Sequence, residues 1–253
     1  MRFSKWSGLG NDFVIVESEA GVDAVRWCDR KNGIGADGVV IVTPLGGDDY
    51  RMRIVNSDGS EAAMCGNASR CVAKYILAHG LGTTGRSALH TLSGVVRTEV
   101  RPDGAVTVDM GEARPFLGSI WLTAGERKFA AETVSMGNPH AVIFVDDVAA
   151  VPLEKWGPIL EHDQQFPDRC NIEFAEMLAP DRIRMRVWER GCGVTAACGT
   201  GSCATLVAAQ RRRNAAVQAE IILDGGVLTI RREGEGHVFM TGRADEIFQG
   251  EIL

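Results

Sequence analysis

The chain has 253 residues, of which 45% are hydrophobic and 24% charged, as is ordinary for a globular protein. Its formal net charge of −6 argues against a general nucleic-acid binder, which would carry a basic field. The N-terminal sequence lacks the apolar core of a signal peptide and no long apolar run follows, so we expect no membrane association and a cytoplasmic location with seven reduced cysteines.

The first half of the chain has the pattern of short strands around one helix. A Gly-Asn turn precedes an apolar strand in LGNDFVIV (9–16), and turn residues precede Cys65. Apolar residues recur at helical spacing in ASRCVAKYILAH (68–79), and Gly80 offers a stop, so a helix is predicted there. Two more strands are predicted in RMRIVN (51–56) and GVVRTEV (94–100).

The second half repeats this order. A Gly-Asn turn again precedes an apolar strand in MGNPHAVIFV (136–145), and a Gly-containing turn leads to Cys198. A second helix is predicted over GSCATLVAAQRRR (201–213), which is small and apolar before a basic last turn, with Asn214 as its cap. Strands are predicted in RMRVWE (184–189) and GVLTIRR (226–232).

Four segments match between the two halves in the same order, at offsets of 127 to 139 residues. Gene duplication is the economical explanation. The matches align Asn11 with Asn138, and Asn32 with Asn171. The matched segments are 9–16 with 136–145, 29–34 with 168–173, 51–66 with 184–199, and 94–100 with 226–232.

The duplication predicts the fold class. We expect an α+β chain of two pseudo-symmetric domains, residues 1–113 and 114–242, with the change-over near MGEARPFLG (110–118). Each domain is predicted to be a curved mixed sheet wrapped around one central helix.

One cysteine precedes each predicted helix, Cys65 in the first half and Cys198 in the second. A helix N-terminus presents unpaired N–H groups and the positive end of the dipole, which favour a thiolate and bind a carboxylate or phosphate. Two such thiols on opposite sides of one cleft can remove a proton from a carbon beside a carboxylate and return one on the other face. The pattern therefore predicts two acid/base thiols and inversion of a stereocentre.

Competing interpretations of the cysteines carry less support. No C-x-x-C pair exists and the intervals 65–71 and 198–203 are too long for a usual zinc site, so no metal is expected. The chain has no G-x-S-x-G elbow for a catalytic triad. A thiol redox or metal-binding protein stays the alternative from another class. The remaining cysteines are interpreted as small core groups: Cys28, Cys71, Cys170, Cys192 and Cys203.

Taken together, five segments resemble the diaminopimelate epimerase family over nearly the whole chain. They are GLGNDF (8–13), NSDGSEAAMCGN (56–67), SMGNPH (135–140), WERGCGVTAACGTG (188–201) and MTG (240–242). The resemblance implies a cofactor-independent epimerase that interconverts LL- and meso-diaminopimelate, in lysine and peptidoglycan precursor biosynthesis. It also implies a homodimer, and a C-terminal strand at about 243–253 that returns to the first domain. A racemase of another amino acid on the same scaffold is the nearest alternative.

The resemblance also implies roles for individual residues. Glu189 and Arg190 would read the distal amino-acid end of the substrate, although such a pair is often only a surface ion pair. The asparagines would surround the substrate, although Asn also favours turns. The full implied set is Cys65 and Cys198 as catalytic residues, His140 and Glu189 as groups that tune the thiols, and Asn11, Asn56, Gly66, Asn67, Asn138, Asn171, Glu189, Arg190, Gly199 and Thr200 as substrate-binding residues.

Three positions depart from the commonest family pattern. Ala68 stands where many members carry Gly, and Val194 stands where Glu is frequent. Gly38 stands where some members carry a Gln near the substrate, which removes one possible substrate contact and leaves the binding residues near position 38 open. None of the three changes touches either of the two cysteines that precede the helices.

Overall fold

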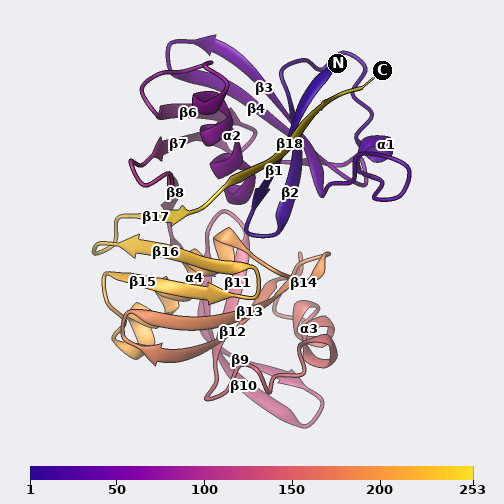
Figure 1. Cartoon of the computed structure of the whole chain (residues 1–253). Coiled ribbons are helices and arrows are strands. Elements are labelled where there is room, and N and C mark those ends of the chain that lie inside the picture. Colours follow the sequence, from indigo (N-terminus) through magenta and orange to yellow (C-terminus); the bar gives the residue numbers. More distant parts are fainter. Residues whose placement is uncertain (253) are drawn as a thin grey trace. The chain divides into compact units, whose positions relative to one another are not determined.

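The computed structural model describes residues 1–252, which divide into two compact units (Figure 1). Unit 1 comprises Met1–Asp109 together with the end of the chain from Thr241, and unit 2 comprises Met110–Met240. Two strands contain the unit boundaries, β8 (Val106–Glu112) and β17 (His237–Gly242).

Unit 1 is a mixed sheet in the order β18-β1-β2-β3-β4-β6-β7-β8. The pairs β2–β3 and β4–β6 are parallel, and the others along this order are antiparallel. A short strand β5 adds to β4 just before the helix of the unit. The remaining strand bounds are β1 (Arg2–Gly8), β2 (Asn11–Val16), β3 (Gly38–Gly46), β4 (Asp49–Asn56), β5 (Glu61–Ala62), β6 (Arg86–Thr91), β7 (Gly94–Val100) and β18 (Asp245–Glu251).

Unit 2 repeats this pairing in the order β9-β10-β11-β12-β13-β15-β16. Its parallel pairs, β11–β12 and β13–β15, stand at the places of β2–β3 and β4–β6. The short β14 adds to β13 as β5 does to β4. The strand bounds are β9 (Arg114–Ala124), β10 (Arg127–Ser135), β11 (Pro139–Phe144), β12 (Asn171–Ala179), β13 (Arg182–Glu189), β14 (Gly193–Thr195), β15 (Gln218–Leu223) and β16 (Gly226–Arg232).

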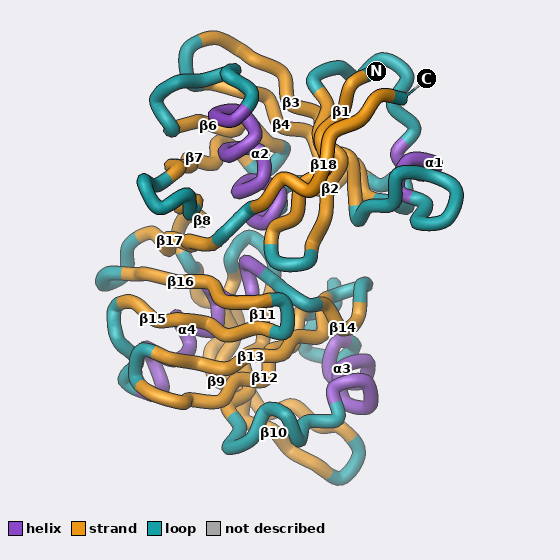
Figure 2. Tube along the Cα trace, viewed as in Figure 1, coloured by secondary structure: helices purple, strands orange, loops and turns teal. Residues whose placement is uncertain are grey.

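One long helix lies among the strands of each unit, α2 (Gly66–Ala78) and α4 (Gly199–Arg213) (Figure 2). Ten residues of each helix are buried, because small side chains such as Ala, Ser, Cys and Gly let the strands approach on several sides. Both predicted helices are confirmed, including the left-handed cap at Asn214 with φ 52°. The predicted fold class is confirmed too. The shorter helices α1 (Ala24–Cys28) and α3 (Leu153–Glu161) precede β3 and β12.

The last strand of the chain lies beside the first. β18 pairs antiparallel with β1, from Arg2 opposite Glu251 to Ser7 opposite Asp245, and both termini lie together in Figure 1. The N-terminal ammonium donates a hydrogen bond of 2.6 Å to the carbonyl of Ile252. Unit 1 therefore completes its sheet with residues from the end of the chain.

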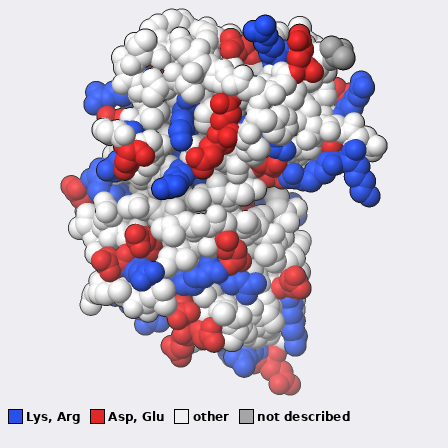
Figure 3. All heavy atoms as spheres, viewed as in Figure 1, with Lys and Arg blue, Asp and Glu red and all other residues white. Residues whose placement is uncertain are grey.

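The face shown in Figure 3 carries Lys and Arg interspersed with Asp and Glu in both units, and no continuous basic patch forms on it. Over residues 1–252, no helix reaches the length and apolar character needed to cross a membrane.

Candidate functional site

The two cysteines singled out by the sequence are the N-cap residues of the buried helices. Cys65 precedes α2 in an extended conformation, with φ −143° and ψ 117°, and Cys198 precedes α4 with φ −127° and ψ 112°. In each case the carbonyl of the cysteine accepts the N–H and the hydroxyl of the serine four residues on, Ser69 and Ser202 respectively, at 2.8–3.0 Å. The duplicated sequence thus places both thiols by the same local device.

The surroundings of the Cys198 thiol oppose its ionisation. Cys198 is 4% exposed, and its sulfur accepts the Gly201 N–H at 3.4 Å and lies 3.7 Å from Thr200 Oγ1. Burial raises the pKa of Cys198 well above its ordinary value, and the carboxylates of Glu189 and Glu173 raise it further. These effects outweigh the helix N–H and the Thr200 hydroxyl, so the prediction that the helix end favours a thiolate is wrong for Cys198 here.

A buried histidine and glutamate lie behind Cys198. Nδ1 of His140 is 2.6 Å from Oε1 of Glu173, and neither side chain has any exposed surface. Nε2 of His140 is 3.0 Å from Oδ1 of Asn138, whose Nδ2 donates to Thr200 Oγ1 at 3.4 Å. The second carboxylate oxygen of Glu173 is buried with no hydrogen-bond partner among residues 1–252. A polar chain thus links the strands β11 and β12 to the first turn of α4.

Glu189 belongs to the same cluster. Its carboxylate accepts a hydrogen bond from Thr195 Oγ1 and another from the Cys198 thiol. Burial raises the pKa of Glu189, although the Thr195 bond and the charge of His140 oppose the increase. Glu189 therefore lies with the thiol and not with its sequence neighbour Arg190.

Arg190 has a different environment. Its guanidinium donates to the backbone carbonyl of Asp168 at 3.2 Å, and within the described residues no carboxylate lies at ion-pair distance from it. The Arg190 backbone N–H donates to Asn171 Oδ1 at 3.0 Å, and Asn171 Nδ2 donates to the Pro139 carbonyl at 2.8 Å. The alternative of a Glu189–Arg190 surface ion pair is thus not what the structure contains, and the guanidinium is available for an anion.

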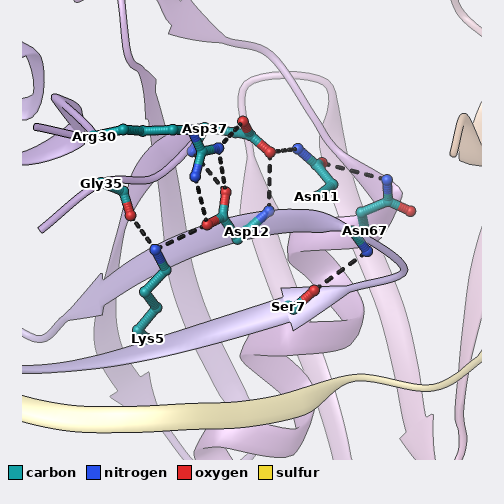
Figure 4. A network of polar contacts seen from close by, with 9 residues as sticks. Lys5, Ser7, Asn11, Asp12, Arg30, Gly35, Asp37 and Asn67 are labelled. Carbon is teal, nitrogen blue, oxygen red and sulfur yellow. Dashed lines mark hydrogen bonds and ion pairs between the residues drawn. The ribbon is translucent and has the colours of Figure 1, made fainter. Parts of the chain in front are cut away.

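In unit 1, Asn11 lies beside Cys65. Oδ1 of Asn11 is 3.8 Å from the Cys65 sulfur. The same oxygen accepts a hydrogen bond from Asn67 Nδ2 at 3.3 Å (Figure 4). Asn67 is buried, and its own Oδ1 has no hydrogen-bond partner among residues 1–252. Asn56 lies apart from this group at the end of β4, where its side chain donates to Ser60 Oγ at 3.0 Å.

The parallel strand pairs give the structural equivalences between the units. Phe13 lies opposite Gly38 in β2–β3, and His140 lies opposite Asn171 in β11–β12. The equivalent of Asn171 is therefore Gly38, and the predicted alignment with Asn32 is wrong. A side chain at Gly38 would also place its Cβ 2.9 Å from the Val55 carbonyl oxygen, so this backbone tolerates only glycine without a shift.

Several groups in these clusters were not predicted. Asp37 and Arg30 contact or support Asn11 in unit 1, and Glu173 supports His140 in unit 2. A glutamate within the apolar run NIEFA (171–175) was the available signal for Glu173, because a charged residue in a buried strand needs a partner. Among the residues described, no group of three or more His, Cys, Asp or Glu side chains is placed to hold a metal ion.

Comparisons with known proteins agree over the full length. The model of the diaminopimelate epimerase family matches residues 3–115 and 132–247. A protein named diaminopimelate epimerase from Synechococcus elongatus is 47% identical over 274 residues, covering 100% of this chain and 98% of its own. One of the same name from Rhodospirillum centenum is 48% identical over 269 residues, covering 99% of this chain and 92% of its own.

Solved structures share the fold at low sequence identity. A PhzF-family phenazine biosynthesis protein from Bacillus anthracis superposes with a TM-score of 0.75 at 16% identity, covering 100% of this chain and 99% of its own. A hydroxyproline epimerase from Agrobacterium vitis does so with a TM-score of 0.71 at 15% identity, covering 100% and 90%. The family match, the full-length relatives and the paired N-cap cysteines lead to one conclusion: the chain belongs to the diaminopimelate epimerase family.

Proposed function

We propose that the chain interconverts LL- and meso-diaminopimelate without a cofactor, by moving the α-proton between two thiols, Cys65 and Cys198. Its family makes the chain an isomerase. The observation that carries the two-thiol mechanism is the N-cap position of both cysteines, on equivalent helices of the duplicated units. A thiol at that place lies beside N–H groups that can hold the carboxylate of the reacting carbon.

The proposed reaction balances without any further reagent. One cysteine, as a thiolate, takes the α-proton: a C–H bond breaks, an S–H bond forms, and the electron pair is delocalised into the carboxylate. The other cysteine, as a thiol, gives its proton to the opposite face of the carbon. The two sulfurs exchange protonation states, and proton exchange with solvent water returns each to its starting state before the next turnover in the same direction. The raised pKa of Cys198 suits the thiol form, which is the proton donor.

The other predicted residues take part as binding groups in this proposal. The backbone turns Gly66-Asn67 and Gly199-Thr200 hold the reacting carboxylate, since unpaired N–H groups there stabilise the charge that develops. The asparagines Asn11, Asn56, Asn138 and Asn171 supply donors and acceptors around the substrate. His140 and Glu189 tune the Cys198 thiol, with which both are connected.

Arg190 is proposed to bind the distal carboxylate of the substrate. A guanidinium pairs with a carboxylate through two parallel hydrogen bonds, which a backbone carbonyl partner cannot match. The contact with Asp168 leaves that pairing open. Glu189, by contrast, lies with the thiol, so its role in reading the distal ammonium has less support than its role as a tuning group.

The proposal includes the assembly and the division of the chain. A homodimer in the cytoplasm is proposed, with a domain formed by residues 1–113 and 243–253 and another by 114–242. Light scattering of the purified protein tests the dimer, and a mass of one chain would refute it.

The direct test is incubation with LL-diaminopimelate in deuterated water, with no pyridoxal phosphate added. The expected result is conversion toward meso-diaminopimelate, with deuterium at the α-carbon of the product and, at early times, none in the remaining substrate. This asymmetry follows from two separate proton carriers. Deuterium in both isomers from the start would indicate a single base, and exchange only with another amino acid would indicate a racemase of different specificity.

Two matched pairs of variants complete the test. Cys65→Ala and Cys198→Ala are each expected to abolish conversion. Cys71→Ala and Cys203→Ala remove buried thiols from the interiors of the same two helices, and each is expected to retain most of the activity. Near-normal turnover by either N-cap variant would remove that cysteine from the mechanism.

A further inference from the structure

The orientation of the Asn11 side chain is determined by its neighbours. Oδ2 of Asp37 lies 2.6 Å from Asn11 Nδ2 (Figure 4). A carboxylate has no hydrogen to donate, so the group that faces Asp37 must be the amino group of the asparagine. The carbonyl oxygen of Asn11 then faces the other way, toward the Cys65 sulfur at 3.8 Å and Asn67 Nδ2 at 3.3 Å.

Asp37 is itself held in place by a charged cluster. Its carboxylate accepts the Asp12 N–H at 3.0 Å and pairs with Arg30 at 2.7 Å. Arg30 also makes two hydrogen bonds to the Asp12 carboxylate, at 2.8 and 3.1 Å, and Lys5 lies 2.9 Å from the same group. Two positive and two negative charges balance within the cluster, so Asp37 has little freedom to turn away from Asn11.

The duplicated copy orients its asparagine in the opposite sense. Cys170 and Pro139 stand at the places of Asp37 and Asp12, and neither offers a carboxylate. Oδ1 of Asn138 instead faces Nε2 of His140 at 3.0 Å, and its amino group donates to Thr200 Oγ1 in the first turn of α4.

The pair that supports this second arrangement has no counterpart in unit 1. The register places Phe13 and Val40 where unit 2 has His140 and Glu173, so apolar side chains replace the buried polar pair. The two equivalent asparagines therefore present different groups to the helix: an oxygen in unit 1 and an amino group in unit 2.

We infer that Asp37 is a positioning residue, which holds the carbonyl oxygen of Asn11 toward Cys65 and so favours the protonated thiol over the thiolate at this cysteine. The consequence for turnover rests on the proposed function, in which Cys65 exchanges a proton with the substrate. An acceptor beside the sulfur stabilises S–H and repels S⁻, whereas an amino group would do the reverse. Asp37 thereby makes two cysteines that are equivalent by duplication chemically different.

The test reads the thiol directly. Alkylation by iodoacetamide is followed against pH, and the Cys65 and Cys198 peptides are quantified by mass spectrometry in the same samples. In Asp37→Asn, the alkylation midpoint of Cys65 should fall by about one pH unit, a tenfold change in the thiolate fraction below the midpoint, while that of Cys198 stays unchanged. The kcat/KM for diaminopimelate should fall at least about tenfold.

Two control variants test whether the effect is specific to a carboxylate at position 37. Asp29→Asn removes a carboxylate from the same loop, where Asp29 bonds Lys31 and Asn32 but not Asn11, and should leave the Cys65 midpoint as in the wild type. Asp37→Glu keeps an acceptor for the amino group of Asn11 and should restore most of the wild-type midpoint. None of these variants replaces the other titratable or charged residues near Asp37, Asn11 and Cys65. These residues are Lys5, Asp12, Cys28, Arg30, Arg70 and Cys71.

A second variant keeps the inference testable if Asp37→Asn does not fold, as judged by circular dichroism. Asn11→Ala removes the acceptor itself and should lower the Cys65 midpoint by a similar amount. An unchanged Cys65 midpoint in either variant, an equal shift in Asp29→Asn, or an equal shift at Cys198 would overturn the inference. Because alkylation needs no turnover, full activity of Cys65→Ala would refute the proposed function and leave this measurement standing.

Discussion

Replacement of Gly201 by alanine tests how closely unit 2 packs behind its thiol. A Cβ at this position would lie 2.7 Å from Oε1 of Glu173 and 3.1 Å from the Cys198 sulfur. Neither neighbour can retreat easily, because Glu173 has no exposed surface and is bonded to His140. In unit 1 the equivalent residue is Ala68, which is fully buried, and the strand residue equivalent to Glu173 is Val40.

Two effects of known size oppose one another in Gly201→Ala. Alanine is favoured over glycine within a helix by about 1 kcal/mol. Forcing an extra carbon into a packed interior costs about 1–3 kcal/mol. We therefore expect a net loss of between about 0 and 2 kcal/mol in the free energy of unfolding. In a chain of this length, each kcal/mol lost from the free energy of unfolding lowers the melting temperature by about 2–4 °C.

Thermal and urea unfolding measure the effect, with Glu173→Val as the matched background because it copies the strand of unit 1. In that background Gly201→Ala should be neutral or stabilising, so the two changes should be non-additive by about 1 kcal/mol or more. The shifted sulfur should also lower kcat by about 10- to 100-fold. If Gly201→Ala alone stabilises the protein and keeps full activity, the close approach of Glu173 and Cys198 to this helix turn is refuted.

Three further predictions address the charges and thiols. Arg190→Ala should raise KM for diaminopimelate by at least about 100-fold, and Arg190→Lys should recover only part of the lost affinity, since a guanidinium pairs with a carboxylate through two bonds. If steady-state kinetics gave wild-type values for both variants, other residues would bind the distal carboxylate. Burial opposes ionisation of Asp12, but hydrogen bonds from Arg30 and Lys5 lower its pKa to about 2. The stabilisation that Asp12 contributes is therefore present above about pH 4 and is lost as the pH falls toward 2. Asp12→Asn should flatten the dependence of the free energy of unfolding on pH in this window, and an unchanged slope would contradict the assignment. Mild oxidation should join Cys65 to Cys198 with reversible loss of activity, if both flank one carbon; peptide mapping that never finds this bond would count against the two-thiol cleft.

The helices and their cysteines were predictable because the signals are local. Each helix is marked by small apolar residues at helical spacing, by a glycine or asparagine at its end and by a turn before the cysteine. These signals lie next to one another in the sequence. The similarity of the two units followed from the duplication, which needs only the order of the matches. The structure bears this out in the identical sequence of parallel and antiparallel pairs in the two units.

The features that sequence missed depend on strand register and on burial. The equivalent of Asn171 is decided by which residues lie opposite one another in β11–β12, and a short match to Asn32 could not show that. Asp37 reaches Asn11 from a separate loop, and Glu173 reaches His140 across a parallel pair. Which cysteine rests as the thiolate was not decided by the sequence, because burial and the carboxylates that raise the pKa of Cys198 against the effect of the helix end come from other elements of the fold.

The place of β18 bears on the order in which the newly made protein reaches its native form. In unit 2 the equivalent edge strand, β9, directly precedes β10 in the chain, so every strand from β9 to β16 is synthesised before β18. Domains usually fold in the order of their synthesis. Here unit 1 is begun first and completed last, because β1 pairs with β18, which is formed by residues 245–251. A translation product that stops before Asp245 would leave β1 with an open edge, although all of unit 2 had been made.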